Sequence, residues 1–128
     1  MTKLLKHEHL LISAHVNRPP VDGQQEELKN WIIGLVNLIG MNILAGPIVA
    51  YVDKAGNRGL TAVTIIETSH IAIHIWDEPE PALIQLDVYS CDELDPSLVI
   101  EHLALFDIVD IEFKFLDREN GFVEKKLK

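Results

Sequence analysis

The sequence predicts an α+β protein in which one mostly antiparallel sheet carries two helices on one face, a two-layer sandwich. Two patterns lead to this prediction. Stretches of alternating apolar and polar residues recur along the chain and are typical of half-buried strands. Two other segments repeat their apolar residues at helical spacing. The length of 128 residues is enough for one hydrophobic core, so residues 1–128 are expected to form a single domain.

The first third of the chain is expected to form a strand followed by a helix. Residues 4–16 include a run of alternating side chains, which predicts a strand. Asp22 follows a loop with two prolines and is expected to cap a helix over residues 24–39. Gly40 is expected to end this helix, because glycine readily adopts the backbone conformation of a helix terminus.

The middle of the chain is expected to form four strands joined by turns. Each is rich in β-branched or alternating residues and is bounded by glycine, proline, asparagine or aspartate. These strands are expected at residues 48–52, 60–67, 68–78 and 82–91. In the third of them, three isoleucines would share one face, and two histidines and a tryptophan would share the other.

The last third of the chain is expected to form a second helix and a final strand. Asp95 before Pro96 is a typical helix start, because the carboxylate caps the first amides and proline fits the first turn. The helix is expected to carry apolar residues as far as Phe106, and residues 107–117 alternate as a strand. The polar tail from Arg118 is expected to be loose. The expected order is β-α-β-β-β-β-α-β.

Composition and charge narrow the classes of function. The chain has 20 acidic and 11 basic residues and a net charge of -9, so nucleic acid and anionic membranes are not expected as partners. This charge favours solubility and is compatible with a cationic ligand. No stretch is long and apolar enough to span a membrane or to resemble a signal peptide, so a cytoplasmic protein is expected. Cys91 is the single cysteine, which excludes an internal disulfide and fits a reducing compartment.

The candidate functional residues gather on the central strand and on the strand that follows it. They are Ser69, His74, Trp76, Glu78 and Cys91. Each has a common structural role as well: a turn serine, a hydrogen-bonded histidine, a packed indole, a solvated carboxylate and a small buried thiol. The case for a site rests on all five lying on two adjacent segments, and their spacing alone selects no reaction.

The histidines raise the alternative of a metal protein. They are His7, His9, His15, His70, His74 and His102. His7 and His9 form an H-x-H pair on one strand face. Zinc and iron sites use three or four ligands, and the chain has one cysteine and no H-E-x-x-H motif, so no metal site is expected.

Two stretches resemble a known family. Residues 67–78 (Glu-Thr-Ser-His-Ile-Ala-Ile-His-Ile-Trp-Asp-Glu) and residues 85–91 (Gln-Leu-Asp-Val-Tyr-Ser-Cys) resemble the short, prokaryotic-type S-adenosylmethionine decarboxylase proenzymes. Those proteins usually carry Glu-Ser-His, two residues, Ile-His, one residue and Trp-Pro-Glu, and later an Asp-Val-aromatic segment that ends in cysteine. The resemblance extends through residues 9–12 and 59–61, so it covers most of the chain.

The resemblance implies a self-processing enzyme with a pyruvoyl cofactor. In this family the serine attacks the preceding carbonyl, the peptide bond becomes an ester, and elimination followed by hydrolysis leaves a pyruvoyl group on the downstream chain. This group is the electron sink for the loss of CO₂. Carried over by position, cleavage would fall between Thr68 and Ser69. His74 would transfer protons during processing, and the Thr61 hydroxyl would assist it.

The same resemblance implies a substrate and a partner. The substrate would be S-adenosylmethionine, whose decarboxylation feeds polyamine (spermidine) synthesis, and the enzyme would be a homodimer. Cys91 would protonate the decarboxylated carbon. Trp76 would stack on the adenine, and Glu78 would hold the ribose hydroxyls. A cationic sulfonium substrate suits an acidic protein.

The chain departs from the family pattern at three places. Thr68 stands where the family has glutamate. Asp77 replaces the proline of Trp-Pro-Glu, and the loop to the cysteine is longer than usual. Residues 54–58 lack the aromatic residue expected ahead of Thr61, and Tyr51 is the nearest one. Two alternatives therefore stay open: an unprocessed homologue that binds S-adenosylmethionine or a related cation, and a pyruvoyl decarboxylase for another amino acid.

Overall fold

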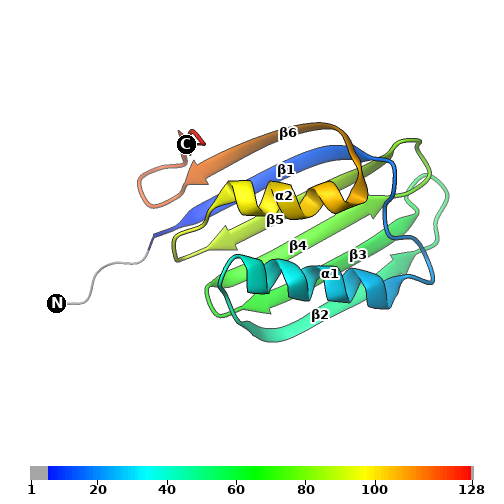
Figure 1. The fold of residues 1–128 in the computed structure, drawn as a ribbon, viewed down its shortest axis with the longest axis horizontal. Coiled ribbons are helices and arrows are strands. Elements are labelled where there is room, and N and C mark those ends of the chain that lie inside the picture. Colours follow the sequence, from blue (N-terminus) through cyan, green and yellow to red (C-terminus); the bar gives the residue numbers. More distant parts are fainter. Residues whose placement is uncertain (1–5, 128) are drawn as a thin grey trace.

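The computed structural model describes residues 6–127 and shows one antiparallel sheet with two helices on one face (Figure 1). The strands in this part of the chain are β1 (Glu8–Val16), β2 (Ile43–Val52), β3 (Gly59–Ile66), β4 (Ser69–Trp76), β5 (Ala82–Ser90), β6 (Ile108–Asp117) and β7 (Val123–Lys125). The helices are α1 (Gln25–Leu38) and α2 (Pro96–Leu103), and a 3₁₀ turn follows at Ala104–Phe106. The sheet order is β2-β3-β4-β5-β1-β6-β7, and every pairing among these strands is antiparallel. The expected α+β sandwich is confirmed.

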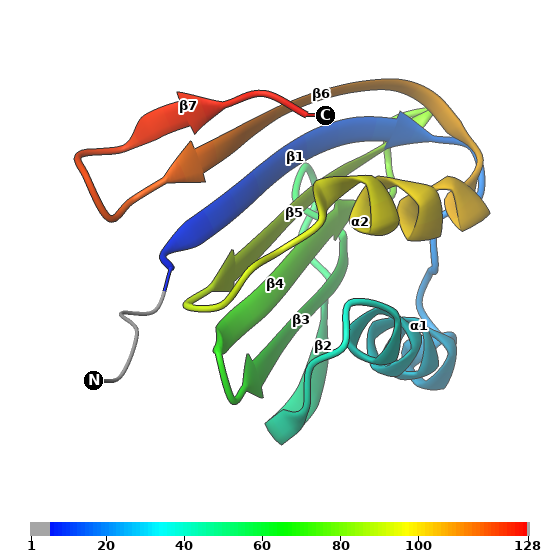
Figure 2. The ribbon, with the colours of Figure 1, turned by 60° about the vertical axis from the view of Figure 1, so that its left-hand side comes forward.

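The hydrophobic core lies between the sheet and the helices. Successive side chains of a strand point to opposite faces, so alternate strand residues are buried beneath the helices. The fully buried residues include Leu10, Ile73, Ile84, Leu86, Leu28, Ile32, Leu35, Val99 and Leu103. Figure 2 shows both helices on the same side of the twisted sheet, which leaves the other face uncovered in this chain. We call that uncovered face the outer face.

The first helix begins later than the sequence suggested, and Asp22 does not cap it. Gln24 is the residue before the first turn. The amide of Gln24 bonds to the carbonyl oxygen of Val21 over 2.8 Å, so residues 21–24 form a separate turn. The Asp22 carboxylate accepts hydrogen bonds from the Gly23 amide and the Gln25 side chain within that turn.

The end of the first helix is as expected. Gly40 has a φ of 74°, the left-handed conformation that favours glycine. Its amide bonds to Asn37 and the next amide, of Met41, bonds back to Val36, which satisfies two carbonyls at the helix end. Neither helix of the described chain is long and apolar enough to cross a membrane.

The second helix begins as the sequence indicated and ends earlier. The Asp95 carboxylate accepts a hydrogen bond of 3.0 Å from the Ser97 amide, and Pro96 occupies the first turn. The helix ends at Leu103, and Phe106 lies in the 3₁₀ turn instead. The expectation that the helix includes Phe106 is therefore wrong. The last turn is tightened into a 3₁₀ turn, which is a common way for a helix to end.

The tail that we expected to be loose contains the short edge strand β7. Lys125 on this strand forms an ion pair with Glu8, whose side chain is 3% exposed. Glu8 also accepts a hydrogen bond from the Leu94 amide. A buried carboxylate needs a cation, so this long-range contact explains why the tail is ordered. The first strand begins at Glu8; residues 4 and 5 of the expected strand lie outside the described residues.

Candidate active site

The site residues predicted from the sequence lie at two ends of strand β4. Ser69 begins this strand, and Trp76 ends it. Ser69 and His74 are five residues apart, which corresponds to roughly 16 Å along an extended strand. Thr61 and Glu78 lie near the His74 end, and Cys91 lies near the Ser69 end. One chain therefore presents two half-sites rather than one complete constellation.

The first half-site is the tight turn between β3 and β4. Ser69 follows this turn with a φ of 141°, a conformation that side chains other than glycine rarely adopt. Holding such a residue costs about 1–3 kcal/mol, and strain of this kind is found at functional sites. Thr68, immediately before it, directs its hydroxyl to the Met41 sulfur at 3.1 Å.

The carbonyl oxygen of Thr68 is held by the backbone of Cys91. The Cys91 amide donates a hydrogen bond of 2.7 Å to it. Ser69 and Ser90 are register partners on β4 and β5, so the end of β5 places Cys91 beside the turn. The Cys91 side chain is half-buried, and its thiol is free. The structure thus brings together Thr68, Ser69 and Cys91, as the sequence predicted for this part of the site.

The second half-site lies on the outer face at the far end of β4. Thr61 and His74 are register partners on neighbouring strands, and the Thr61 hydroxyl lies 3.2 Å from His74 Nδ1. The His74 and Trp76 rings are 6.1 Å apart. All three side chains are half-buried. A hydroxyl and an imidazole at this distance are suited to proton transfer, and the processing roles of His74 and Thr61 stay a prediction.

Trp76 and Glu78 are both bonded to the turn between β2 and β3. The indole of Trp76 donates a hydrogen bond of 2.7 Å to the Asn57 side chain. One oxygen of Glu78 accepts the Gly56 amide at 2.7 Å, and the other lies 3.4 Å from the Arg58 guanidinium. A hydrogen bond to Asp53 raises the pKa of Arg58 above its ordinary value, so this guanidinium stays charged. Sequence reasoning did not identify Asn57 or Arg58 as residues of the site.

Tyr51 does not complete an aromatic stack with Trp76. Tyr51 is the register partner of Leu60, and residues directly opposite in an antiparallel pair share one face. Leu60 is fully buried on the helix side of the sheet. Trp76 lies on the other face, together with His74. In this chain, then, the residues described offer an aromatic platform on one side of the predicted adenine position.

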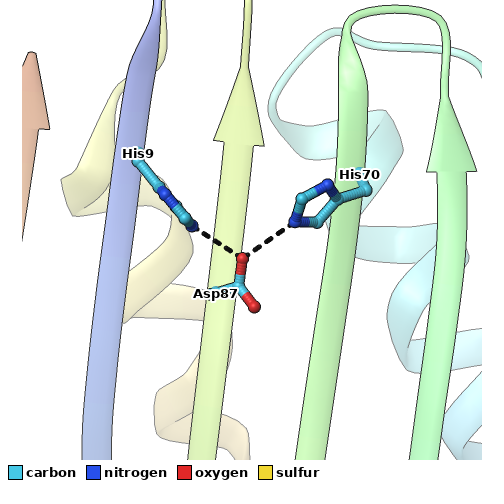
Figure 3. Close-up of side chains that lie close together, drawn as sticks. All are labelled: His9, His70 and Asp87. Atoms are coloured by element: carbon cyan, nitrogen blue, oxygen red, sulfur yellow. Dashed lines mark hydrogen bonds and ion pairs between the residues drawn. The ribbon is translucent and has the colours of Figure 1, made fainter. Parts of the chain in front are cut away.

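Two histidines and one carboxylate that were given no role meet between the half-sites. His9 on β1, Asp87 on β5 and His70 on β4 lie side by side on the outer face (Figure 3). His9 Nε2 is 2.7 Å and His70 Nε2 is 3.1 Å from the same oxygen of Asp87. Burial alone would raise the pKa of Asp87, but the hydrogen bonds from the two histidines outweigh it, and the pKa lies below its ordinary value. His70 and Asp87 belong to the two motifs that resemble the family, so the sequence did indicate that these two residues are close to the site.

A cavity of about 440 Å³ opens on the outer face, over strands β4, β5, β1 and β6. His74, Gln85 and Asp87 line it from β4 and β5. Ser13 and Phe113 line it from β1 and β6. This hollow thus lies over the middle strands, next to His74.

These features define a two-layer α+β domain whose candidate site occupies the outer face and one strained turn of its sheet. A sequence model of S-adenosylmethionine decarboxylase matches residues 8–119, so the chain belongs to the S-adenosylmethionine decarboxylase family. The family resemblance predicted from the motifs is confirmed.

Curated relatives agree with this assignment. The S-adenosylmethionine decarboxylase proenzyme of Pyrococcus abyssi is 28% identical over 96 residues, which cover 74% of this chain and 65% of that protein. The proenzyme of Geobacillus kaustophilus is 37% identical over 51 residues, which cover 40% of each chain. The matched part of this chain thus spans less than two thirds of the length of these relatives.

A solved structure agrees in fold. The crystal structure of adenosylmethionine decarboxylase from Aquifex aeolicus superposes with a TM-score of 0.64 and 24% sequence identity, over 99% of both chains. At this identity the likeness shows the fold alone.

Proposed function

We propose that this protein is a cytoplasmic S-adenosylmethionine decarboxylase that cleaves itself between Thr68 and Ser69 and serves polyamine synthesis. The observation that carries the proposal is the hydrogen bond of 2.7 Å from the Cys91 amide to the Thr68 carbonyl oxygen, next to the strained Ser69. The names of the relatives and the family assignment support the same activity.

The turn is suited to the self-cleavage step. The Cys91 amide polarises the Thr68 carbonyl and stabilises negative charge on its oxygen when the Ser69 hydroxyl attacks the carbonyl carbon. The peptide bond then becomes an ester, and the backbone strain at Ser69 favours this change. Elimination from the ester releases the Thr68 carboxylate. The step uses only the carbonyl of Thr68, and its side chain is turned to Met41, so threonine fits this position.

The residues around Ser69 fit the cofactor that the family implies. A pyruvoyl group derived from Ser69 would supply the electron sink that loss of CO₂ requires. Cys91 lies beside the same turn with a free, half-buried thiol. We assign Cys91 the role of returning a proton to the substrate carbon. Thr61 and His74 would transfer protons during processing.

The two half-sites support a homodimer. Because Ser69 and His74 are roughly 16 Å apart along one strand, His74 cannot reach the Ser69 of its own chain. A second copy placed against the outer face in the opposite strand direction would bring its Thr61 and His74 to this Ser69. The outer face carries exposed apolar side chains that such a partner would cover: Leu11, Val63, Ile65 and Phe113.

A second candidate function is decarboxylation of an amino acid without a nucleoside. Trp76 and Glu78, the residues expected to hold adenine and ribose, already bond to Asn57, Gly56 and Arg58. A smaller cationic substrate would leave these bonds intact. S-adenosylmethionine would instead have to compete with these hydrogen bonds. A homologue that does not cleave itself would bind S-adenosylmethionine without decarboxylating it.

The first experiment is the intact mass of freshly purified protein under denaturing conditions. We expect two fragments, residues 1–68 and a pyruvoyl-capped 69–128, and a single full-length chain in Ser69→Ala. Release of CO₂ from labelled S-adenosylmethionine, with labelled ornithine and arginine in parallel, then identifies the substrate. A wild-type chain that stays at 14.4 kDa after long incubation would contradict self-cleavage and leave the binding protein as the better description.

A further inference from the structure

The side chains of His9, Asp87 and His70 form a compact group on three neighbouring strands. β1, β5 and β4 are adjacent in the sheet, and Figure 3 shows the three side chains converging on the face away from the helices. His9 and His70 are both register partners of Tyr89, so they flank β5 at the same level. The nearest ligand atoms of the three residues all lie within 4.8 Å of one another.

We propose that His9, His70 and Asp87 form a binding site for a transition-metal cation of the zinc and cobalt kind. Metal ligands at bond lengths of about 2.0–2.2 Å lie roughly 3.0–3.4 Å from each other in octahedral or tetrahedral sites. The two nitrogen-to-oxygen distances here, 2.7 and 3.1 Å, are within a few tenths of that spacing. Small rotations of the two imidazoles would open room for the ion.

The chemistry of the donors selects the class of metal. Imidazole nitrogens favour zinc, cobalt, nickel and iron, whereas magnesium and calcium prefer oxygen ligands. Three protein ligands leave a fourth position open, as in catalytic rather than structural sites. Asp87 also lines the cavity of about 440 Å³, through which water can reach that position. In the single chain the side chains of His9, His70 and Asp87 are 16%, 42% and 27% exposed, so an ion has access from solvent before a second copy covers the outer face.

The contact between Arg118 and His9 opposes metal binding at His9. Its guanidinium lies 3.3 Å from His9 Nδ1 and can only donate, so Nδ1 accepts and the proton of His9 is on Nε2. A metal at Nε2 requires the proton to move to Nδ1, which would then face the Arg118 donor. Arg118 is held further by stacking on Tyr89 at 4.4 Å. We therefore expect Arg118 to weaken metal binding.

The test is titration of untagged, chelator-treated protein with Zn²⁺ in a calorimeter. We expect one equivalent per chain, no binding of Mg²⁺, and a loss of tenfold or more in affinity in His70→Gln and in Asp87→Asn. Arg118→Gln should tighten binding severalfold, because a glutamine oxygen can accept the Nδ1 proton of His9. His15→Gln is the matched control: His15 lies on β1 as His9 does and pairs with Asp110 of β6 at 2.7 Å, without a third ligand among the described residues.

Two outcomes of the titration would overturn the site. One is wild-type protein that takes up no Zn²⁺; the other is His70→Gln protein that binds as tightly as the wild type, which would place the ion on the His7 and His9 pair instead. His70 is the most exposed of the three, so its variant should fold even where Asp87→Asn does not. Visible absorption of the wild type with Co²⁺ gives an independent readout, and a spectrum equal to that of aqueous Co²⁺ would also refute the proposal.

Discussion

The amide of Cys91 donates a hydrogen bond of 2.7 Å to the carbonyl oxygen of Thr68, so the end of β5 holds the peptide unit that precedes Ser69. This contact places a candidate proton donor and a polarised carbonyl at the same turn. The strain of that turn is located at one residue, because Ser69 has a φ of 141° while it pairs in register with Ser90. Strain at a named residue can be measured.

Replacing Ser69 by glycine should stabilise the fold relative to replacing it by alanine. Both variants lack the hydroxyl and stay uncleaved, so their free energies of unfolding in urea can be compared directly. Glycine adopts a positive φ without a steric cost, and we expect Ser69→Gly to be more stable than Ser69→Ala by about 1 kcal/mol.

Position 72 on the same strand supplies the control for this comparison. Ala72 is not among the described residues with a positive φ, so Ala72→Gly in the Ser69→Ala background should cost about 0.5–1 kcal/mol. The opposite signs at positions 69 and 72 identify backbone strain. A Ser69→Gly protein no more stable than Ser69→Ala would show that the turn is relaxed.

Co-expression of two inactive variants tests whether a second copy completes the site. A Ser69→Ala chain retains His74, and a His74→Ala chain retains Ser69. If His74 acts across the dimer, mixed dimers contain one complete site, and fragments of the His74→Ala chain should appear in the intact mass. His74→Ala alone should stay uncleaved or cleave at least tenfold more slowly.

The control for this experiment removes His74 from both partners. A Ser69→Ala/His74→Ala chain mixed with His74→Ala should give no fragments, because no imidazole is left to act. Recovery with this partner would mean that dimer formation alone restores processing. Failure of the first mixture to cleave would show that His74 acts within its own chain or not at all.

Local signals predicted most of the fold. Asp95 before Pro96 and Gly40 after the first helix act through neighbouring backbone groups, so the sequence shows them directly. The capping role of Asp22 was wrong because the carboxylate is used within the turn at residues 21–24. Strand β7 was missed because the pairing of Lys125 with Glu8 joins the two ends of the described chain, and no local pattern reports it.

The site was predicted in its parts and not in its arrangement. The motif grouped Thr68, Ser69 and Cys91 in one site, and they meet at one turn because β4 and β5 pair in register there. The distance from Ser69 to His74 follows from the extended strand, yet the sequence analysis grouped both residues in one site of a single chain. The meeting of His9, His70 and Asp87 depends on the strand order β1-β5-β4, which alternation alone does not determine.

Replacing Asp87 by asparagine should reduce stability at neutral pH and lose this effect in acid. The pKa of Asp87 lies below its usual 3.8 in the folded protein, so its ionised form stabilises the fold above that pH. This contribution is lost as the pH falls through the folded pKa. In chelator-treated protein we expect Asp87→Asn to lose about 2 kcal/mol at pH 7, since it removes hydrogen bonds to a charged acceptor.

The measurement is the free energy of unfolding of both proteins from pH 7 to pH 2.5, in the Ser69→Ala background so that each is one chain. The difference between them should stay level down to about pH 4 and shrink below it. The groups hydrogen-bonded to Asp87, which are His9 and His70, and Arg118, which contacts His9, are present in both proteins. Asp110→Asn, at a more exposed carboxylate on the outer face, should change stability by less than about 1 kcal/mol. A difference that is constant with pH would mean that the two histidines do not lower the pKa of Asp87 in the folded protein.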